Sequence, residues 1–513
     1  MSTSLGTDIP VAVLGAGTMG RGIARVAAQA GHRVLLFDSY AAVVTDAIDE
    51  IRHRLERDVE KARLPPAEAE AIADRVSPLS RVDGAGDAGL VVEAIVEDLA
   101  TKIDVLRRVE AVVAPSCIIA TNTSSLSVTA IAAGLERPDR VAGMHFFNPA
   151  PVMPLVEVVA GAATAPEVVE VLCATAASWG KSPVRCASTP GFIVNRVARP
   201  FYGEALRLLE EGVAGIADVD TVIEGAGGFA MGPFTLADLV GLDVNLAVST
   251  SIYEQTYHDP RLAPSVIQRA LVDAGRLGRK TGRGFYDYGP RSERPTPAIH
   301  PPVSSAGIGA VGVAGDLGHA AGLVPRLNAA GVAVERAAAP LPGLVIGDVV
   351  LWPTDGRTAT DAAAAAGAGG VVALDLVADW ETATNVAIAP AARTGPHTVA
   401  EAAAMIQAAG LDAVVVGDGP GLVVMRTVAQ LASVAADAAL RGVASPADID
   451  LAMRLGTNYP AGPLEWADAI GAGTIVAVLD NLQSFYGEDR YRPSTLLRRA
   501  AVTGTAVATG GTP

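Results

Sequence analysis

The sequence predicts an α/β protein in which a doubly wound, mostly parallel sheet is followed by an all-α domain, with a degenerate second copy of both. Three observations support this fold class. Short apolar runs alternate with helical segments up to about residue 187, a glycine-rich turn joins the first run to a helix, and the sequence repeats itself after 230 positions. Repeated strand–helix alternation is typical of parallel sheets covered by helices on both faces.

The N-terminal segment has the pattern of a nucleotide-binding βαβ unit. The apolar run Val11 to Leu14 leads into a GxGxxG turn and a helical pattern, and a second strand, Arg33 to Phe37, ends at Asp38. The glycines of such a turn allow a tight bend, a close approach of the backbone to a pyrophosphate, and close helix–strand packing. The residues that would contact the dinucleotide here are Gly15, Gly17, Thr18, Met19 and Gly20.

The position of Asp38 favours NAD binding by a Rossmann-type domain over a purely structural glycine turn. A carboxylate at the tip of the second strand accepts hydrogen bonds from the ribose hydroxyls and repels a 2′-phosphate. We therefore expect NAD, and not NADP, as the cofactor.

The remaining elements follow in order. Residues 41–76 have apolar positions at helical spacing, and strands are expected at Leu90–Ala94, Ile118–Thr121 and Val141–Phe146. From Pro190 the apolar period becomes helical. The expected domains are an NAD-binding domain (8–187), a helical domain (188–288), a linker (289–305), a degenerate Rossmann-like domain (306–417), a second helical domain (418–500) and a loose tail (501–513).

Composition excludes several classes of protein. The net charge of −16 argues against nucleic-acid binding, and the absence of an unbroken apolar stretch of about 18 residues argues against a membrane span. The three cysteines, Cys117, Cys173 and Cys186, lack the spacing of a zinc site or a disulfide framework. We therefore expect a cytoplasmic protein, and no cluster with ligand spacing predicts a metal.

His145 stands out among the seven histidines because it lies at the end of an apolar strand, where open α/β sheets form their ligand sites. Glu157 follows twelve residues later inside another apolar run. A buried carboxylate needs a partner, and one that accepts from the imidazole would fix the tautomer of a general base. The spacing alone is equally consistent with a hydrogen-bonded pair and with two unrelated side chains at strand ends.

Two further polar features lie in unusual places. Asn195 interrupts the apolar run PGFIVNRV, and Ser124 and Ser125 follow a strand in TNTSSL. These residues could be helix caps or satisfied core groups. Together with His145 they could instead surround one carbonyl or hydroxyl group.

Taken together, these motifs resemble the L-3-hydroxyacyl-CoA dehydrogenase family. The resemblance covers about residues 8 to 288, through GAGTMGRGIA, VVEAIVEDLATK, TNTSSLS, MHFFNPAPVMPLVEVV, STPGFIVNRV, GPFTLADLVGLD and GRKTGRGFYDY. It implies a Rossmann-type domain, a helical dimerising domain and NAD-dependent oxidation of an acyl-CoA substrate. A homodimer is one expected assembly, although the internal repeat could replace the partner.

The resemblance also implies roles for individual residues. His145 corresponds to the base and Glu157 to its orienting partner, while Ser124 and Asn195 correspond to groups that position the substrate. NAD contacts are implied for Asp38, Glu97, Lys102, Ser124, Asn148 and Lys280. The CoA part is implied to contact Arg54, Lys61 and Ser124, although Arg54 stands where the family has a small polar residue.

The second copy has lost the residues that carry chemistry. At a shift of 230 positions TPGFIVNRV aligns with GPGLVVMRT, and Asp220 aligns with Asp450. The counterparts of Ser124, His145, Asn148, Glu157 and Asn195 are Thr354, Asp375, Ala378, Ala387 and Met425. We expect a catalytically silent unit that mimics a subunit interface, a layout also found in long bacterial family members.

Two alternatives remain open from the sequence. A related dehydrogenase of a free hydroxy acid, similar to the lambda-crystallin-like branch, would share the chemistry but need no CoA site. A non-enzymatic nucleotide-binding scaffold would use the second copy as its working part.

Overall fold

The computed structural model describes residues 4–303 and 308–509. The chain forms two compact units: one contains the residues up to Arg196 together with Arg441–Thr457, and the other contains Val197–Leu440 and the residues from Asn458 onward. Residues 304–307, at the junction of the expected linker and degenerate domain, and residues 510–513 of the expected tail lie outside the described residues.

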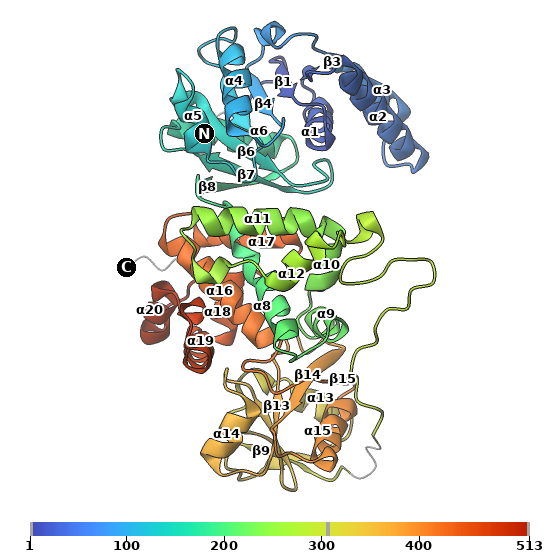
Figure 1. The fold of residues 1–513 in the computed structure, drawn as a ribbon, viewed down its shortest axis with the longest axis vertical. Coiled ribbons are helices and arrows are strands. Elements are labelled where there is room, and N and C mark those ends of the chain that lie inside the picture. The colour runs from blue at the N-terminus through green and yellow to red at the C-terminus, as the bar shows by residue number, and fades with distance from the viewer. Residues whose placement is uncertain (1–3, 304–307, 510–513) are drawn as a thin grey trace. The chain divides into compact units, whose positions relative to one another are not determined.

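The first unit is built on an eight-stranded sheet in the order β3-β2-β1-β4-β5-β6-β7-β8 (Figure 1). All neighbouring strands are parallel except β6 and β7, which are antiparallel. The predicted mostly parallel sheet is therefore confirmed. The strands are β1 (Val11–Leu14), β2 (Val34–Phe37), β3 (Val76–Pro78), β4 (Leu90–Glu93), β5 (Ile118–Thr121), β6 (Val141–Phe146), β7 (Leu155–Ala160) and β8 (Ser182–Ala187).

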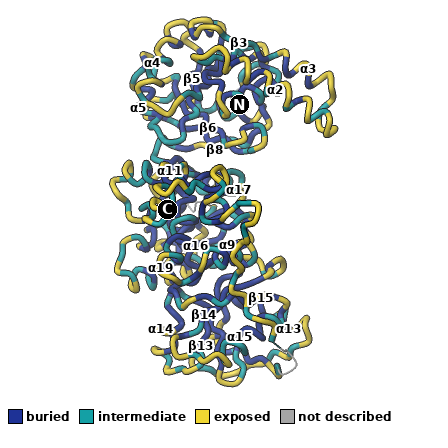
Figure 2. The backbone as a smooth tube through the Cα atoms, turned by 45° about the vertical axis from the view of Figure 1, so that its right-hand side comes forward, coloured by how far each residue is buried: buried dark blue, intermediate teal, exposed yellow. Residues whose placement is uncertain are grey.

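Helices cover both faces of this sheet, and α2 and α3 form a hairpin whose far end is largely exposed (Figure 2). The helices of the unit are α1 (Thr18–Gln29), α2 (Ala41–Glu60), α3 (Pro66–Asp74), α4 (Leu99–Glu110), α5 (Val128–Ala133), α6 (Pro166–Ser178), α7 (Val194–Val197) and α17 (Pro446–Thr457). Short 3-10 turns are η1 (Val82–Ala85) and η2 (Pro138–Arg140).

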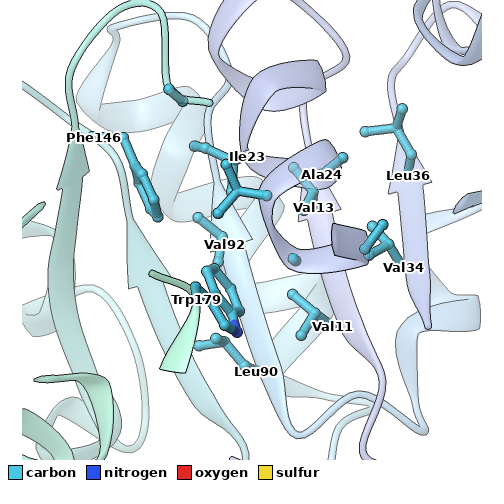
Figure 3. Packing of buried hydrophobic residues seen from close by; sticks show 14 of the residues in the cluster. Val11, Val13, Ile23, Ala24, Val34, Leu36, Leu90, Val92, Phe146 and Trp179 are labelled. Carbon is cyan, nitrogen blue, oxygen red and sulfur yellow. The ribbon is translucent and has the colours of Figure 1, made fainter. Parts of the chain in front are cut away.

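The central strand β1 is buried on both faces, as a doubly wound sheet requires. Val11 and Val13 join the core beneath α1, while Ala12 and Leu14 join a second core on the opposite face. Figure 3 shows Ile23 of α1 among the side chains of the first core. Alternation along one strand thus anchors helices on both sides.

The second unit contains helices from both copies of the repeat. They are α8 (Arg199–Glu210), α9 (Ile216–Gly225), α10 (Pro233–Val240), α11 (Leu242–Gln255), α12 (Val266–Asp273), α16 (Val424–Leu440), α18 (Pro463–Ile470), α19 (Ala472–Tyr486) and α20 (Thr495–Thr503), with 3-10 turns η3 (Pro260–Leu262), η4 (Arg279–Thr281) and η7 (Asp489–Tyr491). Helix α16 is buried along most of its length and packs against α8.

This unit also contains a seven-stranded mixed sheet in the order β10-β9-β11-β12-β13-β14-β15. The strands are β9 (Val311–Ala314), β10 (Val334–Arg336), β11 (Gly343–Ile346), β12 (Val349–Pro353), β13 (Gly370–Leu374), β14 (Asn385–Pro390) and β15 (Asp412–Val415). Its helices are α13 (Leu323–Ala329), α14 (Ala359–Ala366), α15 (Pro396–Ala408) and the 3-10 turn η6 (Gly318–Ala320). The antiparallel hairpin β11–β12 lies at the centre of this sheet and interrupts the parallel order of the strands. This copy is therefore a reduced form of the nucleotide-binding fold.

Each unit combines the sheet of one copy with a helix of the other. In the first unit α17 packs on β7 and β8, and the N–H of Ala187 donates to the carbonyl of Val443. In the second unit α9 packs on β14, and the N–H of Gly417 donates to the carbonyl of Val213. The two hydrogen bonds are related by the same shift of 230 positions, so the exchange is reciprocal.

The C-terminal tail, which was expected to be loose, is fixed by hydrogen bonds as far as residue 508. The N–H groups of Val507 and Ala508 donate to the carboxylate of Asp468, and Val507 is buried. Among the described residues no single helix has the length and apolar character to cross a membrane, although the bent pair α10–α11 meets those criteria jointly.

Candidate functional site

The glycine turn between β1 and α1 has the geometry that a dinucleotide requires. Gly15 has a φ of +99°, a conformation that side chains disfavour, and a Cβ on Gly20 would lie 1.7 Å from the carbonyl oxygen of Gly15. A Cβ on Gly17 would meet nothing within 4 Å. Packing therefore explains two of the glycines, whereas Gly17 leaves open backbone that a pyrophosphate could approach.

Asp38 lies directly beyond β2 and contacts this turn. Its Oδ2 accepts from the N–H of Ala16 at 2.9 Å, and its Oδ1 accepts from the N–H of Tyr40 at 3.2 Å. The carboxylate is therefore fixed beside the turn with lone pairs still available for hydroxyl donors. The local residues fit the adenosine end of NAD.

His145 and Glu157 form a buried hydrogen-bonded dyad. The antiparallel register of β6 and β7 pairs the two residues directly, and Nδ1 of His145 lies 2.6 Å from Oε2 of Glu157. Glu157 is fully buried and His145 is 5% exposed. Because a carboxylate can only accept here, Nδ1 carries the proton and Nε2 is the nitrogen that can receive another.

The same carboxylate is tied to the start of α7. Oε1 of Glu157 accepts from the backbone N–H groups of Ile193 at 3.0 Å and Val194 at 2.9 Å. Asn195 is the next residue in the chain. One buried acid thus fixes both the imidazole and the backbone that carries the predicted substrate-positioning amide.

Two phenylalanine rings flank the imidazole. The ring centroid of Phe147 lies 4.7 Å from that of His145, and Phe192 makes an edge contact at 5.6 Å. They limit the orientations open to the imidazole. Sequence reasoning did not assign a role to either ring, although both adjoin the quoted motifs.

The loop that carries Ser124 is organised by Glu97. Oε1 of Glu97 accepts from the hydroxyls of Thr123 and Ser125 and from the N–H groups of Ser124 and Ser125, at 2.6 to 3.0 Å. Although burial opposes it, these hydrogen bonds and the Lys102 ammonium lower the pKa of Glu97. Glu97 therefore stays ionised and holds the serine loop.

Behind this loop lies a buried carboxylate that the sequence prediction missed. Glu93, at the end of β4, accepts from Nζ of Lys102 at 2.6 Å and from the hydroxyl of Thr121 at 2.7 Å. Lys102 also lies 3.2 Å from Glu97. The interruption of an apolar strand by Glu93 is the same signal that identified Glu157.

A small pocket lies between α1, α2 and the loop after β6. Its basic lining residues are Arg21, Arg25 and Arg54, and Asn148 contributes to its rim. Arg54 pairs with Glu50 at 2.6 Å, and Arg25 pairs with Asp58. Three arginines around one pocket are notable in a chain of net charge −16, and two of them were not predicted as site residues.

Two further predicted contacts are Lys61 and Lys280. Lys61 is exposed at the C-terminal end of α2. Lys280 belongs to the second unit, where its ammonium pairs with Asp243 at 2.6 Å.

In the second copy a single buried acid replaces the dyad. Asp375 follows β13, and its carboxylate accepts from the N–H groups of Val423, Val424 and Met425 at 2.8 to 3.0 Å. These amides include the 230-position counterparts of the two bonded to Glu157. The second copy therefore keeps a buried carboxylate bound to these backbone N–H groups, but it lacks the imidazole.

Comparison with known proteins agrees with this architecture. The family model "3-hydroxyacyl-CoA dehydrogenase, NAD binding domain" matches residues 10–189, and the model of the family's C-terminal domain matches residues 191–288 and 421–511. The "3-hydroxybutyryl-CoA dehydrogenase reduced Rossmann-fold domain" matches residues 351–420.

Individual relatives resemble the whole chain or its first half. The 3-hydroxyadipyl-CoA dehydrogenase of Escherichia coli K12 is 45% identical, with 96% of this chain and 97% of the relative aligned. The mitochondrial hydroxyacyl-coenzyme A dehydrogenase of Sus scrofa is 41% identical over 54% of this chain and 90% of the relative. A solved structure described as a 3-hydroxybutyryl-CoA dehydrogenase of Escherichia coli K12 has a TM-score of 0.89 and 44% identity, and covers 97% of this chain and 99% of that chain. The chain therefore belongs to the 3-hydroxyacyl-CoA dehydrogenase family and is an NAD-dependent oxidoreductase.

Proposed function

We propose that the chain oxidises the 3-hydroxyl group of L-3-hydroxyacyl-CoA reversibly to the 3-oxo group, with His145 as general base and Glu157 as its positioning residue. The observation that carries this proposal is the 2.6 Å contact between Nδ1 of His145 and Oε2 of Glu157. It leaves Nε2 of the imidazole to take the hydroxyl proton as the C–H bond at C3 breaks.

The buried carboxylate supports this chemistry in two ways. It holds the proton on Nδ1, so the lone pair stays on Nε2, and it stabilises the imidazolium that forms when Nε2 gains a proton. Both oxygens of Glu157 are already engaged, so the acid cannot turn away. In the reverse direction Nε2 returns the proton to the 3-oxo oxygen.

Ser124 and Asn195 are the proposed partners of the substrate oxygens. The backbone N–H of Ser124 donates to Glu97, and Asn195 follows Val194, whose N–H donates to the buried Glu157. Fixed donors of this kind stabilise charge that develops on an oxygen during reaction without reorganising.

The proposed NAD site consists of the glycine turn, Asp38, Glu97, Lys102, Ser124, Asn148 and Lys280. Bound NAD supplies the acceptor for the hydride that leaves C3. The open backbone at Gly17 and the amide-bound carboxylate of Asp38 support this assignment.

The proposed CoA site runs along α2, with Arg54 and Lys61 as cations for its phosphates. The arginine-lined pocket beside Arg54 supports this assignment, because anionic groups need local cations on an acidic protein. It also favours a CoA thioester over a free hydroxy acid as substrate.

The second copy is proposed to be catalytically silent and to stand in for a dimer partner. The reciprocal packing of α17 on the first sheet and α9 on the second supports this role, because exchange of equivalent elements is the mark of an isologous interface. Dimerisation beyond this internal pair remains a prediction, as does the cytoplasmic location.

The decisive experiment compares His145→Ala with the wild type in the reduction of acetoacetyl-CoA by NADH. We expect kcat to fall at least about 100-fold, the usual contribution of a general acid–base group. His397→Ala, at a histidine with an 87% exposed side chain on α15, is the matched control. Undiminished turnover by a folded His145→Ala variant would exclude the assignment.

A further inference from the structure

Lys181 is a buried cation of the first unit that the proposed reaction does not use. It lies directly before β8 and is 9% exposed. Its Nζ donates to the backbone carbonyl of Ala150 at 2.6 Å and to that of Met153 at 2.9 Å. No carboxylate pairs with it within the described part of the chain, and burial lowers the pKa of its ammonium group. Burying a cation without an acid is costly, so the position of Lys181 requires an explanation.

The two carbonyls belong to the β6–β7 loop (residues 147–154), which joins the two strands that carry the dyad. Inside this loop the N–H of Val152 donates to the carbonyl of Pro149 at 2.9 Å. At the end of the loop the N–H of Ser182 donates to the carbonyl of Pro154 at 2.7 Å. The ammonium group adds two charge-assisted hydrogen bonds, which are stronger than these backbone pairs.

The β6–β7 loop also carries part of the proposed site. Residues 148–151 line the arginine pocket, and a Cβ on Gly22 of α1 would lie 3.2 Å from Cβ of Ala150. The loop is therefore packed closely on the helix that follows the glycine turn. Asn148 is exposed, and its side chain makes no hydrogen bond to any described residue. Its position thus depends on the loop backbone, which Lys181 holds.

The second copy holds the equivalent carbonyls with a different cation. At the 230-position shift, the two carbonyls bound by Lys181 correspond to those of Trp380 and Ala383. Nη1 of Arg326, on α13, donates to the carbonyl of Trp380 at 2.8 Å and to that of Ala383 at 3.1 Å. The position equivalent to Lys181 is Leu411, so the two cations come from different elements. Both copies therefore supply a cationic donor to the same pair of carbonyls.

The two loops differ in what they carry. In the first copy the loop presents Asn148, whereas the counterpart of Asn148 in the second copy is Ala378. A cation that only shaped the fold would have the same consequences in both copies. A cation that also serves ligand binding would affect the kinetics only in the first copy. The repeat thus provides an internal comparison between the two roles.

We propose that Lys181 is a positioning residue for cofactor binding, whose ammonium group holds the β6–β7 loop so that Asn148 is in place before NAD binds. This inference rests on the proposed NAD site. A loop that is already in the competent shape avoids the loss of apparent affinity that follows when only a fraction of molecules is competent. The dyad is held separately, by strand pairing and by the N–H groups that donate to Glu157. Lys181 should therefore act on KM and not on kcat.

The test compares Lys181→Met with Arg326→Met, the matched control that removes the corresponding cation from the second copy. The readouts are KM for NADH and kcat in the reduction of acetoacetyl-CoA. We expect Lys181→Met to raise KM for NADH about tenfold and to keep kcat within about threefold of the wild type. Arg326→Met should change neither. Both melting temperatures should fall, because each variant leaves two carbonyls without their donor.

Two further measurements keep the proposal testable if Lys181→Met does not fold. Lys181→Arg keeps a cation, and Arg326 shows that a guanidinium can donate to both carbonyls, so KM for NADH should stay close to that of the wild type. In the wild type, the N–H groups of Val152 and Met153 both donate to the carbonyl of Pro149. Hydrogen–deuterium exchange should find these amides protected without NADH. Free exchange until NADH is added would show that the loop is not held in advance.

The kinetic outcomes separate the two proposals. An unchanged KM for NADH in folded Lys181→Met, an equal rise in Arg326→Met, or a fall in kcat alone would overturn the role of Lys181. Asn148→Ala tests the cofactor contact itself. If Asn148→Ala raises KM for NADH and Lys181→Met does not, only the positioning role fails. If Asn148→Ala leaves this KM unchanged, the proposed contact between Asn148 and NAD is wrong.

Discussion

Replacing Glu157 by glutamine tests how the buried acid controls the base. The carboxylate accepts on both sides, from His145 at Oε2 and from two backbone N–H groups at Oε1. Glutamine offers one oxygen and one NH₂ group. If the oxygen stays with the backbone amides, the NH₂ group donates to Nδ1 and forces the imidazole proton onto Nε2.

The reverse orientation keeps the correct tautomer but directs an NH₂ group at two buried donors. Each unsatisfied buried donor costs about 1–3 kcal/mol, so the two together cost about 2–6 kcal/mol against this orientation. The competent tautomer then falls to between about 1 in 30 and about 1 in 20,000 molecules. We expect kcat for the oxidation of L-3-hydroxybutyryl-CoA to decrease by the same factor.

The assay is NADH formation under saturating NAD, together with circular dichroism to establish folding. Glu170→Gln, which breaks a surface pair with Arg185 in the same unit, is the matched control and should be neutral. A folded Glu157→Gln variant with more than about a third of wild-type kcat would show that the acid does not set the tautomer.

Three further predictions concern the cofactor, the serine loop and the second copy. Asp38→Ser should raise the NADPH-to-NADH ratio of kcat/KM by about tenfold or more, and an unchanged ratio would refute its role in cofactor choice. Glu97→Ala removes four hydrogen bonds from the Ser124 loop, so KM for acetoacetyl-CoA should rise about tenfold while the pH profile of kcat keeps its shape. Burial raises the pKa of Asp375 to about 6, so its protonation stabilises the fold below that pH, and the stability is lost as pH rises through 6. Urea unfolding should therefore show the wild type gaining about 1 kcal/mol over Asp375→Asn between pH 7.5 and about pH 5.5, and no gain would contradict the buried acid.

The sequence predicted the first sheet and the two members of the dyad because their signals are local. Apolar runs identified the strands, and a charged residue inside such a run identified Glu157. The antiparallel register that brings His145 opposite Glu157 was not predictable, since spacing in the chain does not specify strand direction. Glu93 is also a charged residue inside an apolar run, but it was not predicted as a site residue.

The repeat was visible in the sequence, but its consequence was not. A shift of 230 positions pairs α9 with α17, yet it does not tell which sheet each helix covers. The choice depends on long-range packing, such as the hydrogen bond from Ala187 to Val443.

A crystal structure of the chain with NAD and acetoacetyl-CoA would test the central claim most directly. The quantity to measure is the distance from Nε2 of His145 to the 3-oxo oxygen of the ligand. The proposed chemistry requires about 2.6–3.2 Å. A separation beyond roughly 5 Å, or an imidazole whose Nε2 faces the ring of Phe192 and not the ligand, would contradict it.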